Sequence, residues 1–474
     1  MANKISSRAT GPGNIKSIAI NSNSSEKKTL DIVSFGPPVV FKYYESLLQD
    51  VIYATVTYVD AGTLPGGTAV SYLPITGSEK VRLQFEDVNE EEIIVELLIN
   101  KVTEVYEDSG KTVVTLEMNS KELFDNDKVR LNTRLDGKIS NHIETILTDE
   151  EYLNTKKELH IEDTENNYNK IMNNKKPFYM MNYFSTLAIP SSGNTNAPKN
   201  SAGYLLWETS KGFHFRSVDW LFNVDTNPRK KSIIYTETPD AGGIDIPEQY
   251  DMKALSFEKD NRNDIKSKLE QGAYSNRLIT FNPFNCYYEV TYPNADNTGA
   301  TGGGQGAPGS QKKTKHPGEA LPVLNPQIKS AKGGKNDFSR TTFKLLDVGT
   351  LPSGSGGERD SDPKEQEQLK KSEEENANPA KTLNQAIMRL NQLNLSKISI
   401  TIPGDFTLHA GDMVFVDSPM LEAGKPTKEQ TALDNQTGGL YIIRDICHYM
   451  TALETYTQIN VVRDSMGRKG KPHG

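Results

Sequence analysis

Apolar and polar residues alternate along the first 120 residues with the period of a β-strand. In the run 51–59, VIYATVTYV, one face collects Ile52, Ala54, Val56 and Tyr58. Strand-like runs rich in Val, Ile, Tyr and Thr cover 31–44, 50–59, 80–85, 93–106 and 113–118. They predict a compact antiparallel barrel over 29–120, with a sandwich as the alternative. The polar, basic residues 1–28 predict a flexible N-terminal arm.

The period changes to that of a helix after Ser120. Residues 140–147 read as a short helix with Ser140 as a candidate N-cap. Its apolar face would consist of Ile143, Ile146 and Leu147. A second helix is predicted from Pro177, because proline is favoured in the first helical turn. Its apolar stripe would consist of Phe178, Met181, Phe184 and Leu187. Residues 121–201 therefore predict a small helical or mixed domain.

Strand-like segments resume near Gly203 and recur near the end of the chain. Residues 204–208 and 213–218 predict a hairpin. Four later segments, 397–402, 413–417, 439–449 and 454–463, have the same character. We interpret the two regions as one discontinuous barrel, formed by 202–237 and 395–464, with 238–394 inserted into it and 465–474 as a basic tail.

The predicted insertion contains the two stretches with the fewest apolar residues. The segments 294–335, rich in glycine, and 349–378, rich in lysine and glutamate, cannot bury enough apolar area to offset chain entropy, which predicts mobile loops. A strand is predicted between them at 338–346. The segment 382–395 predicts an amphipathic helix that packs on the second barrel. Its apolar face would consist of Leu383, Ala386, Ile387, Leu390 and Leu393.

Composition and charge argue against a nucleic-acid-binding, disulfide-rich, membrane-spanning or secreted protein. The chain has 474 residues, 35% of them hydrophobic, and a formal net charge of −8, which disfavours general nucleic-acid binding. Two cysteines, Cys286 and Cys447, exclude a disulfide scaffold and a four-thiolate zinc site. The longest largely apolar run, 177–190, is too short for a membrane-spanning helix, and 1–28 lacks the apolar centre of a signal peptide. We therefore expect synthesis and folding in a reducing cytoplasm.

The sequence contains one glycine-rich motif and several histidines, but neither predicts a binding or catalytic site. Gly304, Gly306 and Gly309 have the spacing of a dinucleotide-binding loop, but the Pro308 and SQKKTKHPG context does not begin a helix. The seven histidines are His142, His160, His214, His316, His409, His448 and His473. None of them has the spacing of a metal motif, so no metal site and no cofactor site is predicted.

Reactive and charged clusters also have simpler interpretations. Cys447 and His448 are neighbours in a predicted strand, so their side chains point to opposite faces, which favours a core cysteine beside a surface histidine over a nucleophile. The acidic runs 86–92 and 373–375 read as solvated faces rather than as paired catalytic carboxylates. The basic clusters 312–315 and 463–471 read as a solubilising loop and tail. We predict no catalytic residues, and no enzyme.

Three stretches resemble a known family. Residues 41–62 (FKYYESLLQDVIYATVTYVDAG) with 73–85 are similar to the first barrel of the central baseplate hub subunit of T-even-type contractile-tailed phages. Residues 134–149, 173–190 and 203–222 resemble the middle of the same family in the same order. Residues 402–419 (IPGDFTLHAGDMVFVDSP), with GLYIIRDICHYMT and YTQINVVRD, resemble closing strands shared with late-control and secretion-spike hubs.

The resemblance implies a mainly β fold with α+β insertions and two antiparallel tube-type barrels in each chain. It implies a homotrimer that forms a pseudo-sixfold ring and joins a hexameric tail tube to a trimeric central spike. Further implied partners are the baseplate wedge proteins, with the tape measure protein as an additional candidate. The implied location is the virion tail baseplate. DNA would pass through the ring without specific binding, for which an acidic chain is suitable. No stable membrane insertion is implied.

Two other functions remain open at this point. The first is the hub module of a type VI-like secretion spike or a late-control tail protein. The second, from a different class, is a cell-envelope-degrading glycosidase or peptidase of the tail. The sequence assigns no individual interface residues in any of these cases.

Overall fold

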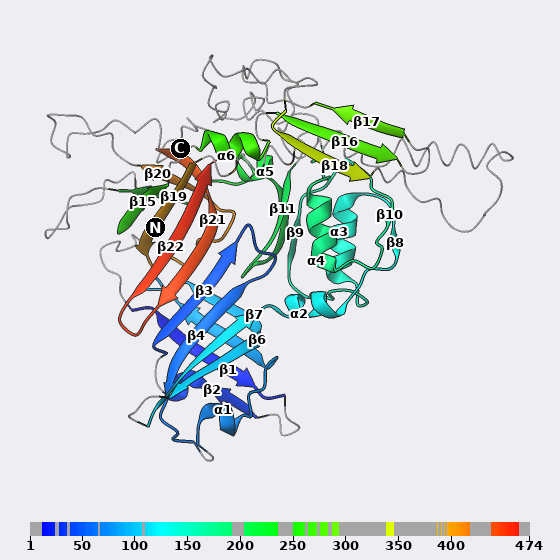
Figure 1. Cartoon of the computed structure of the whole chain (residues 1–474). Helices are drawn as coiled ribbons and strands as arrows, with labels where there is room; N and C mark the ends of the chain where they lie inside the picture. Colours follow the sequence, from blue (N-terminus) through cyan, green and yellow to red (C-terminus); the bar gives the residue numbers. More distant parts are fainter. Residues whose placement is uncertain are drawn as a thin grey trace, which may run out of the picture.

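A computed structural model gives the architecture of the chain. It describes residues 12–23, 28–35, 38–64, 67–106, 110–191, 203–235, 250–260, 264–272, 275–282, 287–292, 338–345, 396–417 and 438–463, with the single positions Ala386, Leu390 and Leu393. The predicted loops 294–335 and 349–378 lie outside these residues, as does the predicted tail 465–474. The fold is mainly β, as the alternating pattern predicts (Figure 1).

Fourteen strands form one large sheet. Its main path has the order β14-β13-β20-β21-β3-β4-β7-β6-β5-β1-β2, and a branch β15-β19-β22 joins it through β21. The path divides at β21 into two groups of strands, which we call the N-terminal β-unit (β1–β7) and the C-terminal β-unit (β13–β15 and β19–β22). In Figure 1 the blue strands of the first unit continue directly into the red strands of the second.

The N-terminal β-unit contains every strand that the sequence predicts in this part of the chain. The unit consists of β1 (Asn14–Asn21), β2 (Thr29–Asp31), β3 (Val40–Ser46), β4 (Tyr53–Asp60), β5 (Lys80–Glu86), β6 (Glu92–Tyr106) and β7 (Thr112–Asn119), with the short helices η1 (Ile32–Phe35) and α1 (Ala69–Tyr72). The strand-like run expected over 31–44 is shorter than predicted, because Ile32–Phe35 form η1 and β3 begins at Val40.

The predicted flexible arm at 1–28 is wrong for its second half. Residues 14–21 form β1, which pairs with β5 and β2, and Ile18 and Ile20 are fully buried. A shift in register between Ile15 and Ser17 breaks the period of two. This irregularity explains why alternation did not reveal the strand.

The C-terminal β-unit joins segments that are far apart in the sequence. It consists of β13 (Lys231–Ile234), β14 (Met252–Lys253), β15 (Ser256–Asp260), β19 (Ser396–Pro403), β20 (Met413–Asp417), β21 (Gly439–Met450) and β22 (Thr455–Arg463). The four late strands agree with the prediction, and β13 pairs with β20 across the expected insertion. β15 belongs to the same sheet through β19, although the prediction placed it inside the inserted segment.

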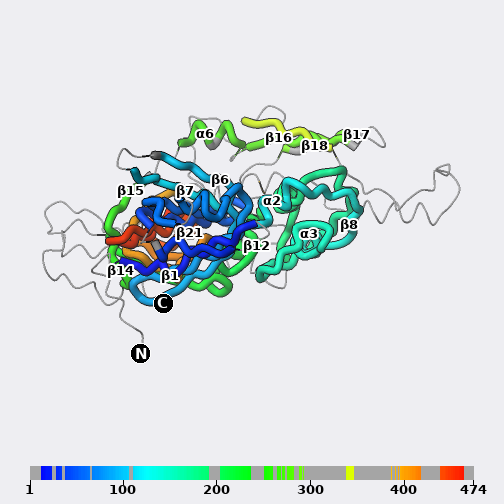
Figure 2. The backbone as a smooth tube through the Cα atoms, turned by 90° about the horizontal axis from the view of Figure 1, so that it is seen from below, coloured from blue at the N-terminus to red at the C-terminus, as the bar shows by residue number. Residues whose placement is uncertain are grey.

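A third group of elements, which we call the helical unit, lies beside the two β-units (Figures 1 and 2). It consists of α2 (Lys121–Lys128), α3 (Ile139–Thr148), α4 (Pro177–Ser185), β8 (Arg134–Leu135), β9 (Leu159–Ile161), β10 (Lys170–Ile171), β11 (Tyr204–Thr209), β12 (Gly212–Ser217) and the short α5 (Val218–Leu221). Pro177 begins α4, as predicted. The hairpin β11–β12 is also confirmed, but it pairs with β9 in a separate sheet instead of with the late strands.

Ser140 does not cap α3, contrary to the prediction. The N-cap is Lys138, and Ser140 is a buried residue of the first turn whose Oγ bonds the backbone N and the Oγ1 of Thr164. The hydroxyl therefore joins α3 to the segment after β9, and the predicted apolar face of Ile143, Ile146 and Leu147 is confirmed as buried.

A small sheet and a short helix lie along one side of the molecule (Figure 2). They are β16 (Asn276–Asn282), β17 (Tyr287–Thr291), β18 (Arg340–Leu345) and α6 (Ile265–Glu270). The strand β18 matches the one predicted between the loops. Of the predicted helix 382–395, Ala386, Leu390 and Leu393 are described, and all three are helical. Leu390 and Leu393 pack on the core of the C-terminal β-unit, and Ala386 is buried.

Each of the three units has its own hydrophobic core. Phe406 and Met450 of the C-terminal β-unit belong to the core of the N-terminal one. The two β-units are therefore packed together as well as hydrogen-bonded. None of the helices in the described part of the chain is long and apolar enough to cross a membrane.

Candidate functional site at the junction of the units

Strand β21 of the C-terminal β-unit pairs directly with β3 of the N-terminal β-unit and forms the centre of the junction. Along one edge it pairs with β22 over most of its length. Along the other edge Gly439–Ile442 pair with β20, and from Asp445 to Met450 the partner is β3. The backbone N–H of Leu47 then donates to the carbonyl of Arg444 (2.8 Å). Main-chain hydrogen bonds thus join the two units into one continuous sheet.

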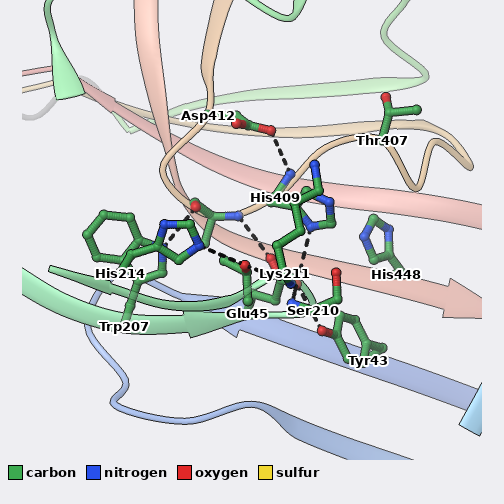
Figure 3. Close-up of polar contacts among 12 residues, drawn as sticks. Tyr43, Glu45, Trp207, Ser210, Lys211, His214, Thr407, His409, Asp412 and His448 are labelled. Carbon is green, nitrogen blue, oxygen red and sulfur yellow. Dashed lines mark hydrogen bonds and ion pairs between the residues drawn. The ribbon is translucent and has the colours of Figure 1, made fainter. Parts of the chain in front are cut away.

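On the buried face of this sheet, the carboxylate of Glu45 in β3 accepts hydrogen bonds from several parts of the chain (Figure 3). Its Oε1 accepts from Tyr43 Oη (2.9 Å) and from the backbone N–H of Ser210 (2.9 Å). The Nδ1 of His409 lies 3.3 Å from the same oxygen, and the N–H of Ala410 donates to Oε2 (3.1 Å). Glu45 therefore connects β3, the β11–β12 turn and the loop before β20.

Electrostatics keep Glu45 ionised. Burial alone would raise its pKa, but the charge interaction and hydrogen bond with His409, together with the Ser210 N–H, outweigh burial and lower the pKa to about 2. The neighbouring His448 is fully buried, and desolvation lowers its pKa to about 4. Its Nδ1 lies 3.0 Å from Thr457 Oγ1, and its ring packs against Phe406. At neutral pH His448 is therefore uncharged.

The β11–β12 hairpin contacts the same loop through Trp207. The indole N–H donates to the carbonyl of Ala410 (3.0 Å), and the ring stacks on His214 with a centroid distance of 5.0 Å. Burial, followed by the charge of His160, lowers the pKa of His214 to about 3. Gly411 has φ of +94°, and a Cβ atom there would lie 2.8 Å from the indole. Glycine is required at this position for both reasons.

A second ionic contact lies within the helical unit, and one of its carboxylates also accepts a hydrogen bond from the N-terminal β-unit. Lys157 Nζ lies 2.5 Å from Glu208 Oε1 and 2.7 Å from Glu122 Oε2, and both carboxylates are buried. Burial alone would lower the pKa of Lys157, but the two carboxylates raise it, so the lysine stays charged. Glu208 also accepts from the backbone N–H of Ile52 (3.0 Å). These groups line a cavity of about 560 Å³ beside β6 and α2.

Two further hydrogen bonds link the ends of the β-units. The buried Asp87, in the β5–β6 turn, accepts from the backbone N–H groups of Asn89, Glu91 and Phe406. The N–H of Gly13 donates to Thr455 Oγ1 (2.6 Å). The prediction that the acidic run 86–92 is a solvated face is wrong at Asp87, because this carboxylate satisfies a turn and a neighbouring loop.

The opposite face of the shared sheet is polar and grooved. A cavity of about 490 Å³ lies over the β3–β21–β22 region, and a second one of about 360 Å³ shares Tyr44, Cys447 and Gln458 in its lining. Asp445 lies on this face and accepts from Ser46 Oγ (2.6 Å), from Arg444 and from Asn460. Burial, opposed more strongly by these donors, leaves the pKa of Asp445 lowered. The face therefore presents hydrogen-bonding groups at the junction.

The Cys447–His448 pair is reversed relative to the prediction. The two side chains do point to opposite faces, but His448 is buried and Cys447 is half-buried on the grooved face. The strand's inner face is polar at this point because Tyr43 and Thr457 surround the imidazole. Burial raises the pKa of the Cys447 thiol to about 11, which disfavours a thiolate nucleophile.

The glycine motif and most of the basic residues singled out in the sequence lie outside the described residues, whereas Arg463 is described. Gly304, Gly306, Gly309 and the basic residues 312–315 and 468–471 lie outside the described residues. Arg463, assigned to the basic tail, is fully buried, donates to the carbonyl of Gly438 and stacks on Tyr441. Within the described residues, no group of three or more His, Cys, Asp and Glu side chains has the geometry of a metal site.

The sequence analysis did not predict the hydrogen bonds that Glu45 accepts from the other segments. The only local signal is an acidic residue at the end of the apolar run VVFKYYES, since an unpaired buried carboxylate in such a run is costly. Its partners His409 and Ser210 are far away in sequence and carry no shared motif. The β3–β21 pairing brings the C-terminal β-unit with His409 next to Glu45, and the β11–β12 turn supplies Ser210 from a separate sheet.

Comparison with known proteins supplies the remaining information. No family model matches the chain, and neither does any curated protein sequence. Among solved structures, the chain is similar to the tail protein from Neisseria meningitidis MC58, at 9% identity and a TM-score of 0.50, over 95% of this chain and 98% of that one. The 43 kDa tail protein of prophage MuSo2 from Shewanella oneidensis matches at 8% identity and a TM-score of 0.46, over 95% and 99%. A type VI secretion system component from E. coli matches at 7% identity and a TM-score of 0.40, over 92% and 75%. At these identities the first match shows a shared fold along nearly the whole chain, that of a tail protein, and the other two add no argument.

Proposed function

We propose that this chain is a structural hub of a contractile phage tail, which joins the hexameric tail tube to a trimeric central spike. The observation that supports the proposal best is the direct pairing of β21 in the C-terminal β-unit with β3 in the N-terminal β-unit, which makes the two units one sheet. A chain with two β-units in one sheet contributes two segments to a ring, so three copies supply the six positions that a hexameric tube requires. The fold shared with a tail protein is consistent with this role.

The two faces of the shared sheet fit a conduit. One face packs on the hydrophobic cores, and the opposite face at the junction presents Ser46, Asp445, Gln458 and Asn460. We propose that this polar face lines the channel through which DNA leaves the particle. A chain with a net charge of −8 repels the phosphate backbone on balance, so DNA would pass without being retained.

The junction network gives the proposed hub its rigidity. Glu45, Glu208 and Asp87 each accept a hydrogen bond from a different unit, and each bond resists a change in the angle between the units. We assign the titratable groups at the junction this structural role and propose no catalytic activity. The partners in the proposal are the spike below, the tube above, the wedge proteins around the ring and the tape measure protein inside the tube.

Assembly measurements test the proposal. In sedimentation equilibrium, alone or with the cognate spike protein added, the chain is expected to form a species of three times the 52.6 kDa of one chain. That species is expected to bind polymerised tail tubes at their ends only. A chain that remains a monomer with the spike and binds no tube end contradicts the proposal. Turnover of peptidoglycan by the purified chain, abolished by a carboxylate substitution, would favour the enzymatic alternative instead.

A further inference from the structure

The two β-units repeat the same hydrogen-bond plan around a bulged hairpin. In the N-terminal unit the N–H of Ile99 donates to the carbonyl of Glu79, and the N–H of Ser78 donates to the carbonyl of Ile99. In the C-terminal unit Ile443 makes the same pair of bonds with Asp412 and Gly411. β6 shifts register against β7 just after Ile99, and β21 shifts against β22 just after Ile443. Ile99 and Ile443 therefore occupy equivalent positions.

Beyond the bulge, the two hairpins differ in what covers one edge. In β21 the segment 445–450 pairs with β3 on the edge that β20 has left. The equivalent segment of β6 is 101–106, and β5 ends its pairing at Leu98. None of the described strands continues along that edge. Val105, at 57% exposed, lies in this segment. An edge of this kind invites an added strand.

The repeat also identifies the counterpart of β3. β3 pairs with β4, and the N–H of Val39 just before it donates to the carbonyl of Thr57 (2.8 Å). β15 pairs with β19 in the same antiparallel way, and the N–H of Leu255 just before it donates to the carbonyl of Thr401 (2.7 Å). β15 is therefore the equivalent of β3. Among the described strands β15 is bonded to β19 alone, and Leu255 beside it is 48% exposed.

We infer that β15 of one copy pairs antiparallel with residues 101–106 of β6 in the next copy, as β3 pairs with β21 within the chain. The inference rests on the proposed ring for the number of copies and on the internal repeat for the register. By equivalence with Phe41↔Met450 and Tyr43↔His448, Phe257 faces Tyr106 and Lys259 faces Glu104 of the neighbour.

The side chains in this register are complementary. Val102 packs on the core of the N-terminal unit and Phe257 on that of the C-terminal unit, so both mark the inner face of the sheet. Glu104 and Lys259 lie two residues away and share that face. Both are exposed in a single copy. Opposite charges directly across two strands stabilise the pairing, and like charges oppose it.

Cysteine cross-linking tests the register. In the double variant Lys259→Cys/Glu104→Cys, oxidation is expected to join copies covalently, and at completion to give a closed species that contains no monomer on a denaturing gel. Each single variant and the wild type, which retains Cys286 and Cys447, measure the background. The pair Lys259→Cys/Glu96→Cys is the matched control, because Glu96 is an exposed residue of the same strand roughly 26 Å along it.

Charge reversal provides a second readout in the reducing state. Glu104→Lys and Lys259→Glu are each expected to weaken self-association about fivefold or more per interface, and the double reversal is expected to restore most of the loss. Glu96→Lys, a reversal of the same sign on the part of β6 already paired with β5, is expected to leave assembly unchanged.

The outcomes separate this inference from the proposed function. Cross-links in the double variant at high yield, absent from the control pair, support the interface. A trimeric ring that forms no cross-link and is insensitive to both reversals overturns the interface and leaves the hub proposal intact. A chain that remains monomeric and forms no cross-link at high concentration, with the spike protein present, contradicts both.

Discussion

Glu45 and His409 are 364 residues apart in the sequence, yet Glu45 Oε1 lies 3.3 Å from His409 Nδ1. Glu45 is the penultimate residue of β3 in the N-terminal β-unit, and His409 lies in the loop that leads into β20 of the C-terminal unit. Both side chains are nearly inaccessible to solvent. The contact therefore depends directly on the relative position of the two β-units.

Replacing the carboxylate of Glu45 should weaken the contact between the two β-units and destabilise the chain. Glu45→Gln retains the shape of the side chain but loses one acceptor oxygen and the charge that faces His409. We expect a loss of about 2–4 kcal/mol in the free energy of unfolding, measured by chemical denaturation. Glu96→Gln, exposed on β6, is the control and should change stability by less than about 0.5 kcal/mol. An equal effect of the two substitutions would contradict the assigned role of Glu45.

Acid should remove the contribution of Glu45. Its pKa is about 2 in the folded chain against 4.5 ordinarily, so the stabilisation is complete above pH 4.5 and is lost as the pH falls toward 2. The two values correspond to about 3 kcal/mol between pH 7 and pH 2. In Glu45→Gln this part of the acid dependence should be absent. An unchanged acid profile in the variant would assign the loss to other groups.

Buried neutral histidines should make the chain sensitive to mildly acidic conditions. Burial lowers the pKa of His448 to about 4 and that of His214 to about 3. Because the unfolded chain binds these protons near pH 6.5, stability should fall as the pH drops below 6.5, by about 2 kcal/mol for each histidine at pH 5. His448→Gln should show a smaller decrease between pH 7.5 and pH 5 in thermal unfolding. His142 and the other described histidines stay in place in both proteins, so the difference reports His448 alone.

The lysine between two buried carboxylates should be sensitive to removal of its charge. Lys157→Met leaves Glu122 and Glu208 buried without their cation, at an expected cost of about 3–5 kcal/mol. Lys156→Met changes the exposed neighbour in the same way and should be nearly neutral. Hydrogen exchange should show the loss first in α2 and in the β11–β12 hairpin. Equal effects of the two substitutions would contradict the bridging role.

Alanine substitutions at Gly411 and Gly67 separate the cost of an unfavourable φ angle from the cost of a steric clash. Gly411→Ala forces a φ of +94° on alanine and places Cβ against Trp207. Gly67→Ala has a φ of +107° with nothing within 4 Å of the added atom. We expect about 1–2 kcal/mol at Gly67 and a clearly larger loss at Gly411. Tryptophan fluorescence, to which Trp207 contributes, should change only in Gly411→Ala. Similar losses at both sites would mean that the indole moves away without cost.

The sequence predicted the elements whose pattern is local. The alternation in 51–59 identified β4, and Pro177 with its apolar stripe identified α4. β1 escaped prediction because its bulge interrupts the period of two. Ser140 was misassigned because a hydroxyl near a helix start resembles a cap, whereas a partner 24 residues away, Thr164, determines its role.

The junction could not be predicted because it depends on contacts between distant segments. Each strand of the β3–β21 pair is evident from the sequence, but the pairing brings together residues about 400 positions apart. The polarity at Glu45, His409 and His448 is intelligible only after that pairing, since each is a buried polar group with its partner in another segment. The same dependence explains why the inner position of His448 contradicted the local reading of Cys447–His448.

Imaging of the assembled protein by electron microscopy tests the central claim most directly. The account predicts a threefold ring with an open centre, six similar β-units around it and a continuous sheet along the inner wall, in which β21–β3 contacts alternate with contacts between copies. A compact particle without a central opening, at every concentration and with the spike protein present, would contradict it.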